Sequence, residues 1–170
     1  KYFSKSRVAE ADSIITNMKD LAIAVRTADC MPIFVHDPKH QAIGVIHAGW
    51  KGTHVGIIPQ TIKAMQKKFR TRPEDVRVAI GPSIRFCCYE VGKEFKEYFP
   101  QGVTLRKKNL FLDLPKVARR QLRKMGIQEK NIFESSECTF CQKEYFSYRR
   151  EKDKAGRMIS AMMIRDKERQ

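Results

Sequence analysis

Two short stretches of this sequence carry the residue types best suited to chemistry. Residues 27–30 read Thr-Ala-Asp-Cys, and residues 47–52 read His-Ala-Gly-Trp-Lys-Gly. A thiol beside an imidazole is an activated nucleophile, and the same two groups are also good zinc ligands. A buried small thiol and a hydrogen-bonded core histidine are the structural alternative. The spacing alone leaves all three interpretations of Cys30 and His47 open.

The second stretch contains a glycine-rich loop that favours anion binding. A helix that begins just after Gly49 and Gly52 directs unpaired backbone N–H groups and its positive dipole end at the loop. Lys51 adds a positive charge beside it. The alternative is that the glycines only allow a sharp turn from strand to helix. The neighbouring His47 favours the functional interpretation, so we expect this loop to bind phosphate or another small anion.

Arg149 and Arg150 form a second candidate anion site. They follow residues 145–148, which are predicted to form a strand, and two guanidinium groups at a strand end can clamp a phosphate or carboxylate. The alternative is a pair of surface arginines near a basic tail. Asp29, directly before Cys30, is a candidate partner of a metal ligand, a general base or a turn-forming residue.

The remaining cysteines, Cys87, Cys88, Cys138 and Cys141, raise the possibility of a four-thiolate zinc site. Such sites usually come as two spaced pairs, whereas Cys87 and Cys88 are adjacent, so we do not expect a structural zinc there. A redox Cys-x-x-Cys pair is the alternative, although no helix pattern follows Cys141. The odd total of 5 cysteines does not resemble a secreted disulfide framework, which favours reduced thiols in the cytosol.

Apolar runs around the two stretches predict the strands that position them. Residues 21–26 are compatible with a strand, and they deliver Cys30 just beyond their C-terminal end. Residues 31–36 and 42–47 are nearly continuous in apolar side chains, which is typical of strands buried on both faces. A hairpin that brings the strand ends together would place the thiol of Cys30 and the imidazole of His47 in one pocket.

Helical spacing follows the glycine-rich loop. Four apolar residues recur at helical intervals and share one face: Ile58, Ile62, Met65 and Phe69. Thr53 is predicted to cap this helix unless its regular part begins near Pro59. A second helix runs from an Asp113 N-cap to a stop at Gly126. The other predicted elements are a short helix over 91–99, an irregular basic connection over 101–109 and strands over 13–16, 76–80, 131–134, 145–148 and 158–164. The sequence shows no internal repeat and no linker, so these elements predict one mixed α/β domain over residues 1–170.

Charge and composition narrow the classes of function. The 170-residue chain is 42% hydrophobic and 31% charged, an ordinary globular balance, and its net charge is +15. The basic residues are spread along the chain, which favours solvated helix faces over a dedicated nucleic-acid surface. The same charge suits a small anionic substrate such as phosphate. No apolar run reaches the roughly 20 residues of a membrane helix, and no secretory signal pattern opens the chain.

The motifs, taken together and in order, resemble one family. They are Thr-Ala-Asp-Cys at 27–30, His-Ala-Gly-Trp-Lys-Gly at 47–52, Ile-Gly-Pro-Ser at 80–83, Cys-Tyr-Glu-Val-Gly at 88–92, Glu-Cys-Thr at 137–139, Phe-Ser-Tyr-Arg-Arg at 146–150 and Gly-Arg at 156–157. This set resembles the YfiH/YlmD family, also called the laccase-domain or polyphenol oxidase family and associated with purine nucleoside phosphorolysis. The resemblance runs from about residue 12 to residue 164.

The resemblance implies an α+β fold in which mixed β-sheets pack as a sandwich flanked by helices, distantly related to bacterial toxin cysteine hydrolases. It also implies a zinc ion held by a His-Cys-His set, in which Cys30 matches the cysteine and His47 the second histidine. The first histidine of the family lies in an upstream Gln-Val-His-Gly-like motif, and residues 1–12 contain no histidine. We therefore expect this chain to lack the N-terminal part of the family. No motif match supports His36, His40 or His54 as a substitute.

The activity implied is zinc-dependent phosphorolysis of adenosine, inosine, guanosine or methylthioadenosine to the base and ribose 1-phosphate, together with adenosine deamination. The partners are thus a purine nucleoside and inorganic phosphate, in the cytoplasm, without a membrane or nucleic acid. The residues expected to be catalytic are Asp29, Cys30, His47 and Arg149, and those expected to bind substrate or phosphate are Gly49, Lys51, Gly52 and Arg150. The alternatives are a copper-dependent polyphenol oxidase, a metal-free Cys-His hydrolase and a basic nucleic-acid-binding domain.

Overall fold

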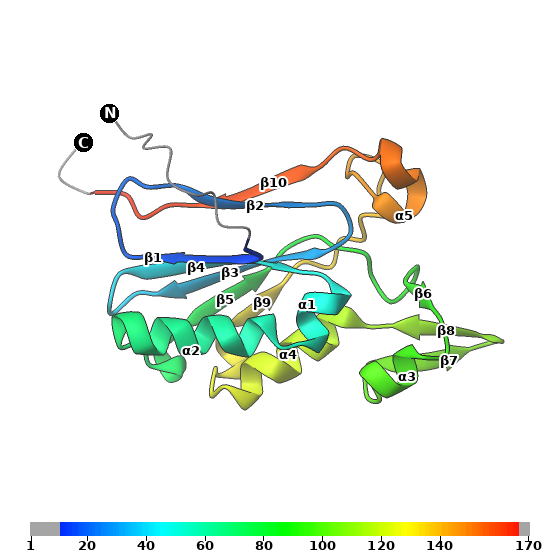
Figure 1. The fold of residues 1–170 in the computed structure, drawn as a ribbon, viewed down its shortest axis with the longest axis horizontal. Coiled ribbons are helices and arrows are strands. Elements are labelled where there is room, and N and C mark those ends of the chain that lie inside the picture. The colour runs from blue at the N-terminus through cyan, green and yellow to red at the C-terminus, as the bar shows by residue number, and fades with distance from the viewer. Residues whose placement is uncertain (1–10, 167–170) are drawn as a thin grey trace.

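The structure is a computed structural model that describes residues 11–166 (Figure 1). The strands are β1 Ser13–Thr16, β2 Ile23–Thr27, β3 Met31–Asp37, β4 Ala42–Ala48, β5 Arg77–Ile80, β6 Glu90–Val91, β7 Val103–Arg106, β8 Asn109–Leu112, β9 Ile132–Glu134 and β10 Met158–Met162. The α-helices are α1 Trp50–His54, α2 Ile57–Phe69, α3 Phe95–Tyr98, α4 Leu114–Lys124 and α5 Tyr148–Glu151. Short 3-10 helices span Pro73–Asp75, Glu129–Asn131 and Lys152–Lys154.

The elements form layers around a five-stranded mixed sheet. Its strand order is β1-β4-β3-β5-β9, antiparallel except for the parallel pair β5–β9. Helices α2 and α4 lie against one face, and the two-stranded sheet β2–β10 lies over the other (Figure 1). A three-stranded sheet of β6, β8 and β7 stands at one end of the molecule with α3. This arrangement confirms the predicted α+β fold of packed sheets flanked by helices.

The central strands are buried because both faces of their sheet are covered. Every residue of β4 except His47 is buried, and β3 is exposed only in part at two positions. On the β2–β10 side, Ile23 and Val25 pack with Ile43 and Val45 to form one apolar cluster. The near-continuous apolar runs of β3 and β4 predicted strands buried on both faces, and the structure confirms this.

The helical layer buries the predicted apolar stripe. Ile58, Ile62 and Met65 of α2 are fully buried, whereas Phe69 is only partly buried at the helix end. The N-cap of α2 is Gly56, with φ 83°, a left-handed conformation that glycine adopts without steric cost. The prediction that Thr53 caps this helix is therefore wrong, because Thr53 is buried inside the separate helix α1.

Two other segments differ from the sequence-based prediction. Residues 101–109, expected to be irregular, contain β7 and part of the antiparallel hairpin β7–β8, with Lys107 at φ 57° in the turn. β7 is only 4 residues long and mostly exposed, so its Val-Thr-Leu-Arg alternation was too short to indicate a strand. The strand expected over 145–148 is also wrong. Ser147 instead caps α5, because its Oγ accepts a hydrogen bond from the Arg150 N–H at 3.2 Å.

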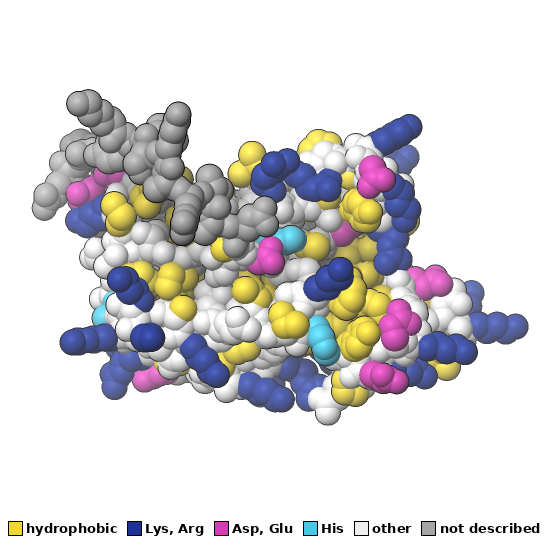
Figure 2. Space-filling model, viewed as in Figure 1, with side chains coloured by type: hydrophobic (Ala, Val, Ile, Leu, Met, Phe, Trp, Pro, Cys, Tyr) yellow, Lys and Arg dark blue, Asp and Glu magenta, His cyan; other side chains and the backbone are white. Residues whose placement is uncertain are grey.

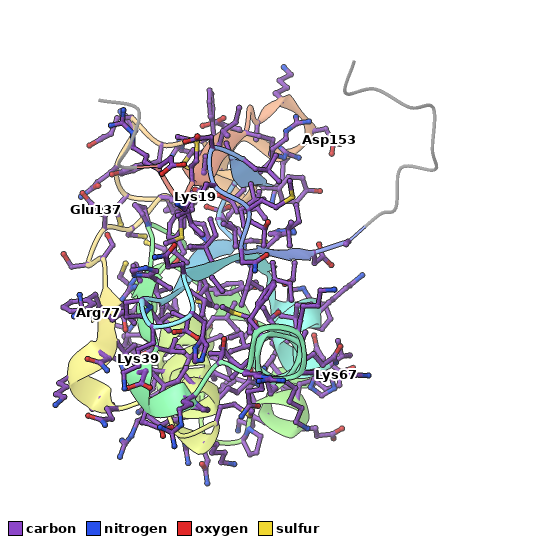
Figure 3. All side chains as sticks on the ribbon, turned by 90° about the vertical axis from the view of Figure 1, so that its left-hand side faces the viewer. Lys19, Lys39, Lys67, Arg77, Glu137 and Asp153 are labelled. Carbon is purple, nitrogen blue, oxygen red and sulfur yellow. The ribbon has the colours of Figure 1, made fainter. Side chains whose placement is uncertain are left out.

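Basic side chains are distributed around the molecule. Lys19, Lys67 and Arg77 lie well apart from one another in Figure 3. Within residues 11–166, no helix is long and apolar enough to cross a membrane. The dispersion agrees with the expected solvated faces.

A buried carboxylate closes the hairpin between β3 and β4. Asp37 Oδ1 accepts hydrogen bonds from the backbone N–H groups of Lys39 at 3.0 Å and His40 at 3.1 Å, and Oδ2 lies 2.8 Å from His40 Nδ1. Burial acts to raise the pKa of Asp37, but the hydrogen bonds it accepts outweigh burial, and its pKa lies below the ordinary 3.8.

We expect the Asp37→Asn variant to unfold with a free energy about 1–2 kcal/mol lower than the wild type at pH 7. Because the folded-state pKa of Asp37 is lowered, the carboxylate stabilises fully above pH 3.8 and this contribution is lost as the pH falls through the folded pKa. Thermal melting of both proteins at pH 7 and near pH 3 measures this difference in stability. The difference should be smaller near pH 3, and an equal difference at both pH values would contradict a stabilising role of the Asp37 carboxylate.

Candidate functional site

Most of the predicted site residues line one cavity of ≈ 610 Å³. Those present are Asp29, Cys30, His47, Gly49 and Arg149. The cavity opens between the start of β3, the end of β4 and α5. The structure therefore brings the predicted thiol, imidazole and one of the two arginines to a single place.

Strand pairing explains why the thiol and the imidazole meet. In the antiparallel pair β3–β4, Pro32 lies opposite His47, so Cys30, just before β3, starts beside the end of β4. Gly49 permits this approach, since a Cβ atom on it would lie 2.9 Å from the Cys30 Sγ atom. A side chain at position 49 would therefore displace the thiol.

The Cys30 thiol is largely enclosed. Burial raises its pKa to about 11, and the nearby carboxylates of Asp29 and Asp12 act in the same direction. At neutral pH the metal-free thiol is thus protonated, and a protonated thiol is a weak nucleophile. A bound cation would favour the thiolate.

His47 is oriented by a carboxylate. Its Nδ1 lies 2.9 Å from Asp12 Oδ1, and its backbone N–H donates to the Asp12 carbonyl oxygen at 2.7 Å. This contact leaves Nε2 as the ring nitrogen available to a ligand. A carboxylate on the other ring nitrogen is the usual arrangement for a metal-binding histidine.

Asp29 ties three distant groups to the cavity wall. Its backbone has φ 80°, and its buried carboxylate accepts hydrogen bonds from Thr139 Oγ1 at 2.6 Å, Ser147 Oγ at 3.1 Å and the Arg149 N–H at 2.6 Å. With both carboxylate oxygens engaged, Asp29 is built to position Arg149 and the β2–β3 turn.

The two adjacent arginines have different surroundings. Arg149 lines the cavity, lies 5.4 Å from the Tyr89 ring centroid and donates from Nη1 to the Glu90 carbonyl oxygen at 2.8 Å. Arg150 faces away from this cavity. Its guanidinium donates to three backbone carbonyl oxygens, of Thr139, Phe140 and Tyr145, and pairs with Glu151 at 2.5 Å.

Lys51 and Gly52 also lie outside the residues that line the cavity. Residues 50–54 are the helix α1 rather than a loop, which corrects the predicted tight loop. Lys51 Nζ lies 5.6 Å from the Trp50 ring centroid, and Gly52 packs close to Ile57. Of residues 49–52, Gly49 and Trp50 reach the cavity.

The cavity also contains groups that sequence reasoning missed. Arg26, Lys152 and Arg157 add positive charge, and Trp50, Tyr89 and Tyr148 add aromatic rings. Figure 2 shows hydrophobic side chains gathered between the α5 end and the β6–β8 end of this face, with lysine and arginine side chains around them. The Gly-Arg motif at 156–157 was a signal for Arg157, whereas Arg26 stands in a strand without any motif.

The donor types at the cavity suit zinc but are incomplete among the described residues. Cys30 and His47 offer one thiol and one imidazole, and the other three histidines do not line this cavity. Within residues 11–166, one group of three or more His, Cys, Asp or Glu side chains is close enough to share a metal: Cys87, Cys88, Cys138 and Cys141. The adjacency of Cys87 and Cys88, which argued against a four-thiolate site, therefore does not keep the four sulfur atoms apart.

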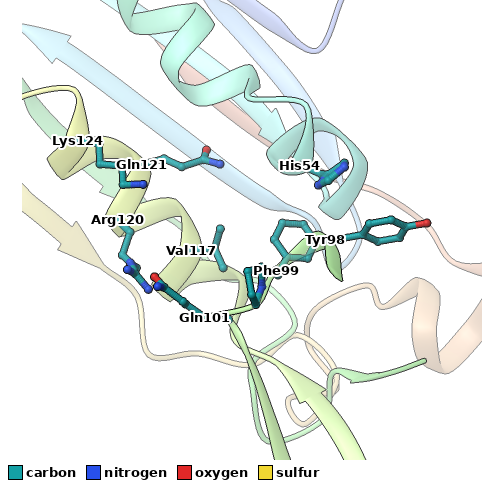
Figure 4. Close-up of a pocket in the computed structure, with 10 residues that line it drawn as sticks. His54, Tyr98, Phe99, Gln101, Val117, Arg120, Gln121 and Lys124 are labelled. Carbon is teal, nitrogen blue, oxygen red and sulfur yellow. The ribbon is translucent and has the colours of Figure 1, made fainter. Parts of the chain in front are cut away.

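A second, smaller cavity of ≈ 220 Å³ lies elsewhere (Figure 4). His54 from α1, Tyr98 from α3 and Arg120 from α4 contribute to its wall. It contains none of the predicted site residues, so Arg120 offers a comparison for the arginines of the first cavity.

Comparisons with known proteins point in one direction. The model of the family described as multi-copper polyphenol oxidoreductase laccase matches residues 2–165. A purine nucleoside phosphorylase of Aquifex aeolicus is 43% identical over 155 residues, which cover 91% of this chain and 71% of that protein. The purine nucleoside phosphorylase YlmD of Bacillus subtilis is 34% identical over 91% of this chain and 59% of its own length.

Solved structures agree. The crystal structure of YlmD from Geobacillus stearothermophilus has a TM-score of 0.87 at 31% identity and covers 95% of this chain and 64% of that one. The crystal structure of the Bacillus licheniformis hypothetical protein YfiH has a TM-score of 0.85 at 33% identity, over 91% and 61%. The chain thus spans less than two thirds of these two structures.

Proposed function

This chain belongs to the laccase-domain family that includes the YfiH and YlmD proteins, and from this premise we propose that it carries the active site of a zinc-dependent purine nucleoside phosphorylase. The observation that carries the proposal is a single cavity in which Cys30 and His47 lie with several guanidinium groups and aromatic rings. Residues 1–170 are proposed to form one domain of this family, in the cytoplasm, where its five free thiols would stay reduced.

The cavity offers what phosphorolysis requires. A phosphate oxygen attacks C1′ of the ribose while the bond from C1′ to the purine nitrogen breaks, and the base leaves with that electron pair and takes up a proton. Arg149, Arg26 and Arg157 would hold the phosphate dianion, because guanidinium groups bind phosphate through charge and paired N–H donors. Tyr89 and Tyr148 offer faces for the base.

The proposed metal site uses Cys30 and His47, with Asp12 fixing the imidazole ring. A zinc ion bound there would supply a Lewis acid and an activated water, the chemistry that deamination of adenosine at C6 needs. A three-ligand site needs one further ligand, and residues 1–170 contain no Gln-Val-His-Gly motif. Adenosine deaminase activity is part of this proposal.

The other predicted residues take supporting roles in this proposal. Asp29 is a positioning residue, because its carboxylate holds the Arg149 backbone. Gly49 leaves space for the thiol. Lys51, Gly52 and Arg150 support α1 and the turn around residue 140 rather than touching the nucleoside.

The test is incubation of the protein with inosine, with and without inorganic phosphate. We expect hypoxanthine and ribose 1-phosphate only when phosphate is present, and ammonia from adenosine in a parallel assay. Hypoxanthine without a phosphate requirement would indicate hydrolysis. Absence of hypoxanthine from a protein that carries zinc would overturn the proposal.

A copper-dependent phenol oxidase is the second candidate, because the family description names that activity. Multi-copper chemistry relies on several histidines, and of the 4 histidines in the chain only His47 lines the cavity. Copper content together with oxygen consumption on a phenol separates the two. A metal-free Cys-His hydrolase is less well supported, because burial raises the pKa of Cys30 to about 11.

We expect Arg149→Gln to raise the KM for phosphate by at least about tenfold, since one charge-assisted contact contributes about 1.5 kcal/mol or more. Steady-state phosphorolysis at varied phosphate measures this. Arg120→Gln is the matched control, because Arg120 lines the other cavity (Figure 4). An equal change in KM in both variants would show that general surface charge, rather than a phosphate contact at Arg149, is responsible.

A further inference from the structure

Four thiols gather at a distance from the Cys30 cavity. The Sγ atoms of Cys87, Cys88, Cys138 and Cys141 all lie within 4.8 Å of one another. Cys141 Sγ is 3.2 Å from Cys88 Sγ and 3.7 Å from Cys87 Sγ. A tetrahedral zinc with bonds of about 2.3 Å to sulfur separates its sulfur atoms by about 3.8 Å. The cluster therefore has the dimensions of a four-thiolate site.

Backbone hydrogen bonds hold the two cysteine turns side by side. Ser83 and Cys138 form a parallel bridge, and the Thr139 N–H donates to the Ser83 carbonyl oxygen at 3.1 Å. On the other turn, the N–H groups of Cys88 and Tyr89 both donate to the Arg85 carbonyl oxygen at 2.9 Å. The sulfur atoms are thus gathered by the fold and not by chance rotamers.

Sequence adjacency is no obstacle in this geometry. Cys87 and Cys88 lie on a tight turn, so both thiols reach the facing turn of Cys138 and Cys141. The turn therefore directs two adjacent thiols toward one point, just as the two-residue spacer directs the two thiols of a Cys-x-x-Cys pair.

Backbone donors surround the most buried sulfur. Cys138 is 6% exposed, and its Sγ accepts from the Arg85 N–H at 3.5 Å. The backbone N–H groups of Phe140 and Cys141, the second and third residues after Cys138, also face this sulfur. N–H donors of this kind favour a thiolate, the form that binds metal.

The surroundings also permit a metal to enter and its charge to be offset. Cys87 and Cys141 are exposed, so an ion has a path from solvent. Arg106 lies beside the cluster, donating from Nη2 to the Cys87 carbonyl oxygen at 2.8 Å. A positive side chain here reduces the excess negative charge of four thiolates around a divalent ion.

We propose that Cys87, Cys88, Cys138 and Cys141 bind one structural zinc ion as four thiolates, independently of the Cys30 and His47 site. Binding releases the four thiol protons and changes no oxidation state. Four protein ligands close the tetrahedral shell, so the ion holds the fold rather than acting on substrate. The site joins the turn of Cys138 and Thr139 to the rest of the chain, and Thr139 in turn holds Asp29.

The test is the zinc content per chain of protein purified with reductant and without oxygen. We expect Cys141→Ser and Cys87→Ser to carry one zinc fewer than the wild type. Both residues are exposed, so the fold should survive, as circular dichroism would check. Cys30→Ser is the matched control, because it should keep this ion whatever the fate of the proposed active site. Equal zinc in the wild type and Cys141→Ser would overturn the proposal.

Cobalt substitution gives a second measurement that needs no variant of the cluster. Co²⁺ bound by four thiolates absorbs strongly in the visible region and shows sulfur-to-cobalt charge-transfer bands in the near ultraviolet. We expect the four-thiolate bands in the wild type and also in Cys30→Ser, which should lose only the contribution of the single thiolate at the proposed active site, whether or not phosphorolysis is found. Iron in the cluster, or a disulfide between Cys88 and Cys141 in the anaerobic protein, would contradict the assignment.

Discussion

Replacement of His47 by alanine is expected to lower kcat/KM for phosphorolysis by at least about 100-fold and to reduce the zinc content of the protein. His47 and Cys30 line one cavity, and the imidazole is held by Asp12 at 2.9 Å. Loss of the imidazole removes a proposed metal ligand and leaves no donor in its place. The rate of hypoxanthine formation, measured with metal analysis on the same sample, tests this.

The matched control is His36→Gln. His36 lies on the neighbouring strand β3, is partly buried like His47, and does not line the cavity. We expect its activity to match the wild type. Asp12→Asn should give an intermediate loss of about tenfold, since it disturbs the ring orientation without removing the ligand. Full activity in the His47→Ala variant would exclude this histidine from the reaction.

Asp29→Ala is expected to lower the free energy of unfolding by about 3–4 kcal/mol, because it removes the acceptor of three hydrogen bonds and leaves buried donors unpaired. Alanine also disfavours φ 80°, which the turn requires. For a chain of this size the melting temperature should fall by roughly 10 °C. Thermal unfolding followed by circular dichroism measures the change.

Two further variants separate the effect of the lost hydrogen bonds from that of the strained backbone. Asparagine tolerates the left-handed backbone and keeps one acceptor oxygen. Asp29→Asn should therefore lower the free energy of unfolding by less than Asp29→Ala does. Thr139→Val removes one hydrogen bond and should cost about 1–2 kcal/mol. Equal stability in Asp29→Ala and the wild type would show that the network does not hold this part of the fold.

The sequence predicted best the elements whose apolar pattern matches their burial. The runs of β3 and β4 and the stripe of α2 have this property, because covered sheets and helix faces impose it. The hairpin β7–β8 was not predicted, since β7 is only 4 residues long and mostly exposed, so its short alternation of apolar and polar residues does not correspond to burial. For α5 the signal was the N-cap Ser147, a single residue that an apolar and aromatic neighbourhood obscured.

The residues of the candidate site likewise include some that the sequence could predict and some that it could not. Motif residues such as Cys30 and His47 could be selected from the sequence because their chemistry is rare. Arg26 could not, because a strand arginine joins a cavity only through β-sheet packing. The four-cysteine cluster was considered from the sequence but not expected, since spacing rules describe single loops, whereas here two distant turns meet through the bridge between Ser83 and Cys138.

The hydrogen bonds of Asp29 also bear on the order of folding. They join residues that are 110, 118 and 120 positions apart, and β2 pairs with the far C-terminal strand β10. Contacts of such long sequence separation form slowly, because a large loop must close first. During synthesis, Cys30 and His47 therefore emerge long before the segment that carries Arg149. The cavity wall can be completed only after the segment that carries Arg149 and Arg157 has left the ribosome.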